Sequence, residues 1–384
     1  MQKNLYFYSD AKEWGGQEIL SAQIASILAE AKNNSDENLY KVHFFYANEN
    51  FEIALSKNIF LFKLPFHSQG PFPIIRDFLW SKINGKIKRK SGVLKKIFQE
   101  VQNTNKNFTE IIICPGNIER CLPAIEAASK LKIKIKSYYP MAFTQKESRA
   151  NFGFIRDKLA FFIYPKINSW VVNTEYQKKL LQRFIKKNVP VQILPNPLTF
   201  NKTAKVKIPE KIQNITTIGR IYFKQKGQEI IPFILKQAKS ENIFLKFHII
   251  GNGPDLKNLN IQIKKYHLKN FVEKVPWANT DTIQNILTEK TDLLFIPSKF
   301  ESGPIVLFEA LECGIPVLIA NEPYVQDYKL PSWMLYTPGS AEDALQKIQE
   351  MPQNFCLEEF EEIRKHLFIG RSRKEFKAQV LNLF

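Results

Sequence analysis

Residues 296–320, IPSKFESGPIVLFEALECGIPVLIA, begin as an apolar strand, pass through a polar loop into a helix and end in a second apolar strand. Apolar side chains cover nearly every side of this helix, which is typical of a buried helix; they are Ile305, Val306, Leu307, Phe308, Ala310 and Leu311. Glu309 interrupts this apolar surface. An ionised carboxylate without a partner would cost several kcal/mol there, so the sequence predicts a specific partner for Glu309.

Short apolar strands alternate with helix-length segments along the whole chain. We expect strands at residues 4–9, 42–47, 59–64, 111–116, 134–139, 169–174 and 191–195, and again at 215–220, 247–251, 271–275, 293–298, 316–320 and 334–338. This alternation is typical of parallel sheets with helices on both faces. The predicted fold class is therefore α/β, with two doubly wound parallel sheets.

A segment rich in proline and asparagine, residues 194–211, separates the two series of strands and is predicted to be a linker with its boundary near residue 205. We expect an N-terminal Rossmann-like domain over residues 1–200 and a C-terminal one over residues 206–365. The remaining residues, 366–384, are predicted to form a helix that packs back on the first domain.

The net charge of +18 is concentrated in the first half of the chain. Residues 1–200 hold 30 Lys and Arg against 16 Asp and Glu, whereas residues 201–384 hold 25 against 21. This asymmetry favours an anionic partner, such as nucleic acid, an acidic membrane surface or a phosphorylated substrate. A general enrichment in lysine is the alternative. Because the chain has no recognised nucleic-acid-binding motif, we expect no nucleic-acid partner.

The four cysteines, at positions 114, 121, 313 and 356, form no CxxC pair and lie in or beside apolar segments, which predicts buried free thiols in a reducing compartment. The first residues have no apolar core of signal-peptide length, and no window approaches 18 uncharged apolar residues. We expect a cytoplasmic protein.

Ligands of open parallel sheets bind at the carboxyl ends of the strands, so the junctions between strands and helices are the places to search. Gly15 and Gly16 follow the first strand, where glycines allow close approach of an anion to a helix N-terminus, although a tight turn explains them equally well. Arg220 and Lys226 follow the strand at 215–220, where they can neutralise a diphosphate or remain solvated surface cations.

The junction at residues 296–312 combines an anion site with two carboxylates. Gly303 is predicted near the N-cap and Pro304 at the first helical position, and Glu301 lies in the loop before them. A carboxylate that accepts hydrogen bonds from two vicinal hydroxyls satisfies both its oxygens, so a ribose diol is a suitable partner for Glu309. A salt bridge to a buried lysine or arginine is the alternative.

Residues 76–96 contain eight Lys or Arg and one Asp, with aromatic and aliphatic residues between them. Such a segment can bind an anionic membrane surface, which would suit a lipid-linked acceptor, or it can be a solvated loop.

The segment FESGPIVLFEALECGIPVLIA, residues 300–320, resembles the signature of the retaining glycosyltransferases of family 4, in which two glutamates eight positions apart precede a Gly-x-Pro-Val run. Three further motifs occur in the same order as in that family: the glycine pair after the first strand, GR followed by KG, and GNGPDL. The resemblance is close in the second half of the chain and loose in the first.

This resemblance implies the GT-B architecture, with two Rossmann-like domains that face each other across a cleft, and a nucleotide-sugar donor held by the second domain. By motif position, Arg220 and Lys226 would neutralise the donor diphosphate, Glu309 would bind the ribose, and Glu301 would contact the transferred sugar. Gly15 and Gly16, and the backbone of Gly303, Pro304, Ile305 and Val306, would lie against the diphosphate. The resemblance implies no catalytic metal. We expect no cofactor, and a UDP-sugar is slightly favoured over a GDP-sugar as the donor.

Two features depart from the family pattern. ESGP replaces the usual Glu-Gly-aromatic-Gly run, and no histidine follows a middle strand of the first domain. The acceptor-side candidates are therefore assigned on position alone: Glu119, Tyr139, Lys146 and His67. The expected function is transfer of a sugar to a lipid-linked glycan, lipopolysaccharide or polysaccharide at the inner face of the membrane. The alternative is a non-catalytic scaffold that binds nucleotide sugar.

Overall fold

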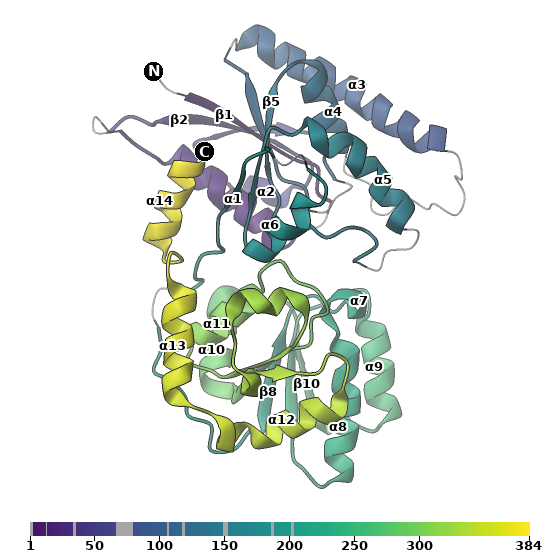
Figure 1. The fold of residues 1–384 in the computed structure, drawn as a ribbon, viewed down its shortest axis with the longest axis vertical. Helices are drawn as coiled ribbons and strands as arrows, with labels where there is room; N and C mark the ends of the chain where they lie inside the picture. Colours follow the sequence, from purple (N-terminus) through teal and green to yellow (C-terminus); the bar gives the residue numbers. More distant parts are fainter. Residues whose placement is uncertain are drawn as a thin grey trace. The chain divides into compact units, whose positions relative to one another are not determined.

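The computed structural model describes residues 3–12, 14–33, 36–66, 80–105, 107–116, 120–148, 153–185, 188–200 and 203–384. The chain divides into two compact units (Figure 1). Unit 1 comprises Met1–Pro195 and Lys374–Phe384, and unit 2 comprises Asn196–Arg373. The divisions thus lie between residues 195 and 196 and between residues 373 and 374, compared with the predicted positions near 205 and 366.

Unit 1 is built on a seven-stranded sheet in the order β3-β2-β1-β4-β5-β6-β7, and all its strand pairs are parallel. Its strands are β1 Lys3–Ser9, β2 Tyr40–Tyr46, β3 Ile59–Lys63, β4 Glu110–Ile113, β5 Lys134–Tyr138, β6 Ser169–Val172 and β7 Val191–Ile193. Each strand lies on a segment predicted from the sequence. The strand order reverses between β1 and β4, so ligands are expected at the carboxyl ends of these two neighbours.

Helices cover both faces of this sheet. They are α1 Gly16–Ala29, α2 Asn50–Ala54, α3 Trp80–Thr104, α4 Leu122–Lys130, α5 Gly153–Ile163, α6 Glu175–Gln182 and α14 Arg373–Leu383, with a 3₁₀ turn at Tyr164–Lys166. Phe98 of α3 packs against Tyr8 and Phe45 on one face. On the other face, Phe51 of α2 packs against Phe44. Alternating residues of a strand point to opposite faces, so this sheet is buried on both sides.

The last helix, α14, belongs to unit 1 and covers the same face as α1 (Figure 1). The Phe384 ring lies 6.3 Å from that of Phe7, and Phe7 stacks on Phe44. Lys3 Nζ donates to the Phe384 carbonyl at 3.0 Å, and Lys136 Nζ donates to the carbonyl of Leu383. The end of the chain is therefore joined to the sheet that its beginning forms.

Unit 2 is built on a six-stranded parallel sheet in the order β10-β9-β8-β11-β12-β13. Its strands are β8 Asn214–Ile218, β9 Lys246–Ile250, β10 Val272–Val275, β11 Leu293–Ile296, β12 Val317–Ala320 and β13 Leu335–Tyr336. These again lie on the predicted segments. The strand order reverses between β8 and β11, which places the expected ligand site of unit 2 at the carboxyl ends of these strands.

The helices of unit 2 are α7 Phe223–Lys226, α8 Ile231–Ser240, α9 Leu256–Lys265, α10 Thr280–Lys290, α11 Ile305–Glu312, α12 Ala341–Asn354 and α13 Leu357–Phe368. Short 3₁₀ turns occupy Gln228–Ile230, Lys269–Phe271, Pro323–Tyr328 and Ser332–Met334. α11 corrects one detail of the sequence analysis. Pro304 is its N-cap and Ile305 its first residue, because Pro304 keeps an extended ψ of 105°.

The cysteines are free, as predicted, and Cys114, Cys121 and Cys313 are buried, whereas Cys356 is half-exposed. The described residues contain no helix that combines the length and the apolar character needed to cross a bilayer.

Candidate functional site

Two glycines bring the loop after β8 into contact with its neighbours at the carboxyl edge of unit 2, Gly227 with the loop after β11 and Gly251 with the loop after β9. Gly227, with φ of +69°, ends α7, and a Cβ on it would lie 2.0 Å from the Pro297 carbonyl oxygen. Gly251, with φ of +137°, approaches Gly219 in the same way, because its Cβ would lie 2.1 Å from the Gly219 carbonyl oxygen. Only glycine permits these close approaches.

Asp255 fixes the loop that contains Arg220. Its carboxylate accepts from the Phe223 backbone N–H at 2.9 Å, and its own N–H donates to the Ile221 carbonyl at 3.1 Å. The sequence analysis did not identify this role. Asp255 occupies the N-cap position of α9. Its side chain, however, accepts a hydrogen bond from Phe223 at the start of α7, so it caps α7 and not α9.

Lys226 and Glu301 form an ion pair at this edge. The Lys226 ammonium donates to Glu301 Oε1, and the two side chains are only 20% and 7% exposed. The pair joins the end of α7 to the loop between β11 and α11, so two residues predicted independently lie in direct contact. An ammonium group has three N–H donors, so Lys226 can donate a hydrogen bond to a phosphate oxygen while it remains paired with Glu301.

Arg220 follows the same strand, β8, and is exposed. Its guanidinium carbon lies 5.6 Å from the centre of the Tyr222 ring, and its backbone carbonyl accepts from Gln228 Nε2 at 3.0 Å. The backbone at Arg220 is thereby fixed, and its charged group lies at the surface.

The start of α11 is held by the segment that enters unit 2. Asn196 Nδ2 donates to the Gly303 carbonyl at 3.0 Å, immediately before Pro304. Arg371 Nη1 donates to the Asn196 carbonyl at 2.8 Å, and its guanidinium lies 4.3 Å from the centre of the Phe308 ring. Burial lowers the pKa of Arg371. Asn196 is a site-supporting residue that the sequence analysis missed, since nothing local to Asn196 indicates a contact 107 residues away.

Glu309 is 7% exposed and has the hydroxyl of Thr199 as a hydrogen-bond partner. Across the described residues, no lysine or arginine forms an ion pair with Glu309, so the salt-bridge alternative is not realised there. Burial raises its pKa from 4.5 to about 7, and the Thr199 hydrogen bond opposes this rise. Glu309 is thus a buried carboxyl group that pairs with no cation of the described residues, and functional carboxylates are often found in such an environment.

Glu312 lies three residues further along α11 and is 1% exposed. Its Oε2 accepts from the backbone N–H groups of Thr199, at 2.9 Å, and Phe200, at 3.1 Å. Burial raises its pKa to about 7, and these two hydrogen bonds oppose the rise. The sequence analysis missed Glu312, although its spacing of three residues from Glu309 indicates the same helix face.

The remaining predicted residues lie in unit 1. Gly15 is the N-cap of α1 in an extended conformation, and Gly16 is the first residue of that helix. Tyr139 is buried among the rings of Tyr164 and Trp170. Lys146 is exposed, and its backbone N–H donates to Asp157 at 3.1 Å. His67 and Glu119 lie outside the described residues.

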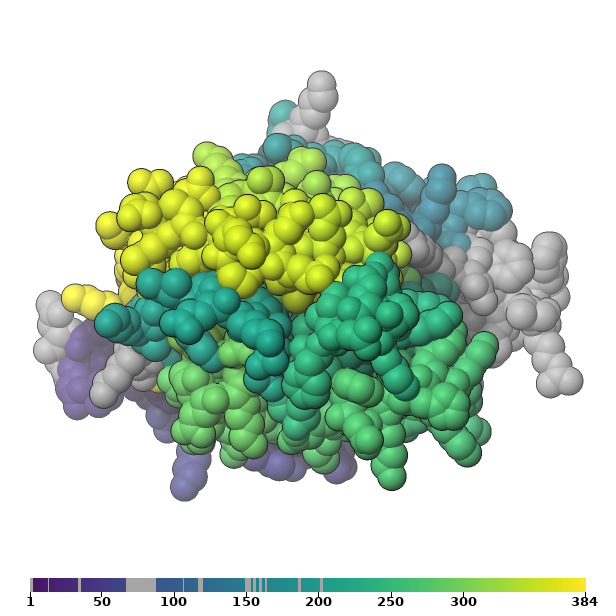
Figure 2. All heavy atoms as spheres, turned by 90° about the horizontal axis from the view of Figure 1, so that it is seen from below, coloured from purple at the N-terminus to yellow at the C-terminus, as the bar shows by residue number. Residues whose placement is uncertain are grey.

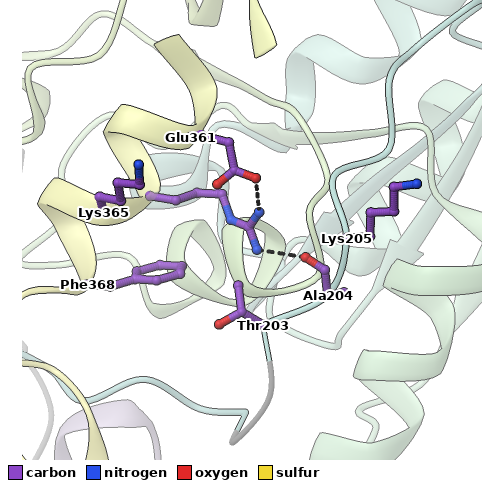
Figure 3. Close-up of a pocket in the computed structure, with 7 residues that line it drawn as sticks. Thr203, Ala204, Lys205, Glu361, Lys365 and Phe368 are labelled. Carbon is purple, nitrogen blue, oxygen red and sulfur yellow. Dashed lines mark hydrogen bonds and ion pairs between the residues drawn. The ribbon is translucent and has the colours of Figure 1, made fainter. Parts of the chain in front are cut away.

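A groove of about 350 Å³ lies elsewhere in unit 2, between α13 and the segment at residues 203–205 (Figure 3). At its base, Arg364 donates to the Ala204 carbonyl at 2.8 Å and to Glu361 at 3.0 Å. In the space-filling view, α13 lies beside this segment (Figure 2). The groove therefore lies where α13 contacts the entering chain, and it is separate from the strand ends described above.

Residues 199–362 match the family model of glycosyl transferases group 1. The matched region contains Arg220, Lys226, Glu301 and Glu309. Among curated proteins, the lipopolysaccharide 1,6-galactosyltransferase of Escherichia coli K12 is 24% identical over 235 residues, which are 59% of this chain and 59% of that protein. The chain thus matches somewhat more than half of the length of this relative.

Two solved structures share the fold over nearly the full chain. The apo form of the lipopolysaccharide outer core galactosyltransferase WaaB superimposes with a TM-score of 0.66 at 17% identity, covering 99% of this chain and 98% of that one. Anabaena HepE in complex with UDP and glucose gives 0.70 at 14% identity, covering 100% and 99%. The fold is GT-B, as the sequence predicted. Together with the family match, these findings support a glycosyltransferase.

Proposed function

We propose that this protein is a retaining glycosyltransferase of family 4 that transfers a sugar from a nucleotide-sugar donor to a lipopolysaccharide or polysaccharide acceptor. The observation that carries the proposal is the Lys226–Glu301 ion pair at the carboxyl edge of unit 2, inside the region that matches the family model. The pair lies where the strand order reverses, which is the usual ligand position of a doubly wound sheet.

The proposed donor roles follow from these positions. Lys226 and Arg220 neutralise the diphosphate, and the backbone from Gly303 to Val306, at the N-terminus of α11, also lies against it. Glu301 accepts hydrogen bonds from hydroxyls of the transferred sugar, and Glu309 accepts from the ribose. The base is proposed to be uracil, which the complex of HepE with UDP supports by analogy.

These groups stabilise the transition state more than the bound donor. As the bond from the sugar to the phosphate lengthens, negative charge grows on the departing diphosphate. The cations of Lys226 and Arg220 stabilise this negative charge. We propose that these cations replace a metal ion. Retention is proposed to follow from attack of the acceptor on the same face, where the leaving phosphate takes the acceptor proton.

Residues 76–96 are proposed to bind the anionic inner surface of the membrane, which would bring the protein to a lipid-linked acceptor. In α3, exposed side chains include Lys88, Arg89 and Lys96. Sedimentation with vesicles of phosphatidylglycerol and phosphatidylcholine should recover the protein at low salt. Substitution of these three residues by glutamine should reduce recovery, whereas equal binding to neutral phosphatidylcholine vesicles would contradict the proposal.

The function is tested with the Lys226→Ala variant. Because a hydrogen bond to a charged group contributes about 1.5–3 kcal/mol, this variant should bind UDP about 10- to 100-fold more weakly in isothermal titration calorimetry. Lys239→Ala, which removes an exposed lysine at the end of α8, is the matched control and should bind UDP normally.

Turnover is then measured with UDP-glucose and UDP-galactose as release of UDP, with EDTA present. Release of UDP from the wild type, and its loss with Lys226→Ala, would support the enzyme. Binding of UDP without any release of UDP from either sugar nucleotide would indicate the non-catalytic scaffold. Absence of UDP binding, or equal binding by the wild type and Lys226→Ala, would overturn the donor site.

A further inference from the structure

Unit 1 carries a cluster of buried charged side chains where its own strand order reverses. Asp10 follows β1 directly, Glu18 lies in the first turn of α1, and Arg120 and Cys121 come just before α4. We name these four residues the switch-point cluster. Asp10 is 2% and Glu18 6% exposed, whereas the Arg120 side chain keeps 17% of its surface exposed.

The cluster joins the loops after β1 and β4. Arg120 Nη1 lies 3.4 Å from Glu18 Oε1, and the Cys121 N–H donates to Asp10 Oδ1 at 3.3 Å. Gln17, beside Glu18, donates to the Pro115 carbonyl. Cys121 has a φ of +62°, a conformation that costs free energy in a residue with a side chain and that the contact with Asp10 helps to maintain.

Two glycines leave room for the charged groups. A Cβ on Gly116 would lie 2.6 Å from Arg120 Nη1, so the guanidinium lies directly against the backbone of the loop after β4. A Cβ on Gly15 would lie 3.4 Å from Glu18 Oε2. The glycine at position 15 thus lies beside the Glu18 carboxylate.

The same arrangement occurs in unit 2. There, Lys226 follows the first central strand, β8, and Glu301 follows its neighbour, β11, and the two form an ion pair. In unit 1, Glu18 follows β1, Arg120 follows its neighbour β4, and the two again form an ion pair with the charges exchanged. Both pairs lie where an open parallel sheet binds its ligand.

The chemistry of the unit 1 pair selects the ligand. Among the described residues, Arg120 is paired with Glu18, and both Arg120 and Lys90 lie near Asp10, so two cations face two carboxylates and positive charge is not in excess. A guanidinium donates several hydrogen bonds and a carboxylate accepts several, so a pair of the two can bind neighbouring hydroxyl groups while it stays formed. Neutral sugar rings present such hydroxyls.

We propose that the switch-point cluster binds the hydroxyl groups of a neutral acceptor sugar, and that Glu18 and Arg120 determine its position. This inference rests on the proposed function and deepens it. It adds to the acceptor-side candidates named from sequence two residues that the structure brings together.

The experiment is a ligand-observed NMR titration of the full chain with UDP present, using methyl glycosides of glucose, galactose, mannose and N-acetylglucosamine. At least one glycoside should bind the wild type. Arg120→Lys keeps the charge but removes the planar fork, and should weaken that binding about tenfold. Gly116→Ala, which displaces the Arg120 guanidinium without removing it, should weaken binding in the same direction.

A double variant separates recognition from folding. Removing one partner of a buried pair leaves an unpaired charge and can unfold the protein, whereas Glu18→Gln with Arg120→Gln removes both charges. If the pair only supports the fold, the double variant should have higher thermal stability and stronger glycoside binding than either single variant. If the pair binds the sugar, stability recovers but glycoside binding stays lost. The control is Glu126→Gln on α4, which breaks the ion pairs of Glu126 with Lys130 on the same helix and with Lys166. This variant should bind glycosides normally.

Failure of this inference is distinguishable from failure of the proposed function, because UDP binding is measured on the same samples. Normal UDP binding with no glycoside bound, or with glycoside affinity equal in all variants, overturns the switch-point assignment alone. Binding of inorganic phosphate that depends on Arg120 also overturns it, since the site would then be an anion site. Absence of UDP binding by the wild type overturns the proposed function itself.

Discussion

Glu309 and Glu312 place two carboxyl groups three residues apart on α11, both buried and both in contact with the segment Thr199–Phe200. Their surroundings differ. Glu312 accepts two backbone hydrogen bonds and so holds the entering chain, whereas among the described residues the hydrogen-bond partner of Glu309 is the Thr199 hydroxyl. A buried carboxyl group with so few partners destabilises the empty protein, a cost often found at binding sites. We therefore assign the structural role to Glu312, which leaves Glu309 for the proposed contact with the ribose.

Glu309→Gln should stabilise the protein at pH 8 and leave its stability nearly unchanged at pH 4.5. The pKa of Glu309 is raised from 4.5 to about 7 in the folded protein, so its stabilising contribution is complete below pH 4.5 and is lost as the pH rises through 7. The gain at pH 8 should be on the order of 3 kcal/mol, measured by urea denaturation. UDP binding should weaken in the same variant.

The control for this prediction is Glu289→Gln, which removes an exposed carboxylate on α10. It should change neither the pH profile nor UDP binding. Parallel pH profiles for the wild type and Glu309→Gln would show that this carboxyl group titrates normally. Unchanged UDP affinity would remove the ribose assignment.

At the scale of elements, the strands were predictable and several contacts of the site were not. Most strands are short, apolar runs, and the central ones are buried on both faces, a pattern that the local sequence predicts. The pairing of Lys226 with Glu301 followed only after the strand order placed β8 beside β11. The contacts of Asn196 with Gly303 and of Glu312 with Thr199 span more than one hundred residues, and no local pattern indicates them.

Gly227→Ala should destabilise unit 2 more than Gly339→Ala does. Both glycines have positive φ, +69° and +78°, so alanine costs about 1 kcal/mol at either from backbone conformation. Only at Gly227 does the new Cβ meet another atom, the Pro297 carbonyl oxygen, whereas nothing lies within 4 Å of a Cβ at Gly339. Gly227→Ala should therefore cost roughly 3 kcal/mol or more in urea denaturation. Equal costs would mean that the two loops separate easily.

At the scale of the whole molecule, unit 2 is one continuous segment and unit 1 is not. Unit 1 is completed by Lys374–Phe384, whose Phe376, Val380 and Phe384 are buried. The excess positive charge of the sequence also lies mainly in residues that form unit 1, which agrees with the proposed membrane contact of that unit.

Truncation after Arg373 should lower the melting temperature of unit 1 and leave that of unit 2 nearly unchanged. Burial of each large apolar side chain stabilises by about 1.5–3 kcal/mol, and the truncation removes three of them from unit 1. Calorimetry should therefore resolve two transitions, with UDP raising only the upper one. The variant Lys374→Gln with Lys377→Gln, which changes exposed residues of α14, should melt like the wild type. A single unshifted transition in the truncated protein would contradict this prediction.

The position of α14 also has a consequence for synthesis of the protein. A ribosome makes the strands of unit 1 before it makes unit 2, but the helix that covers Phe7 leaves the ribosome only after all of unit 2 has been made. Unit 2 can complete its native contacts first, while the part of the earlier sheet that α14 covers stays exposed until the residues of α14 have been made. Loss of Lys374–Phe384 would therefore destabilise unit 1, which is made before unit 2, and spare unit 2.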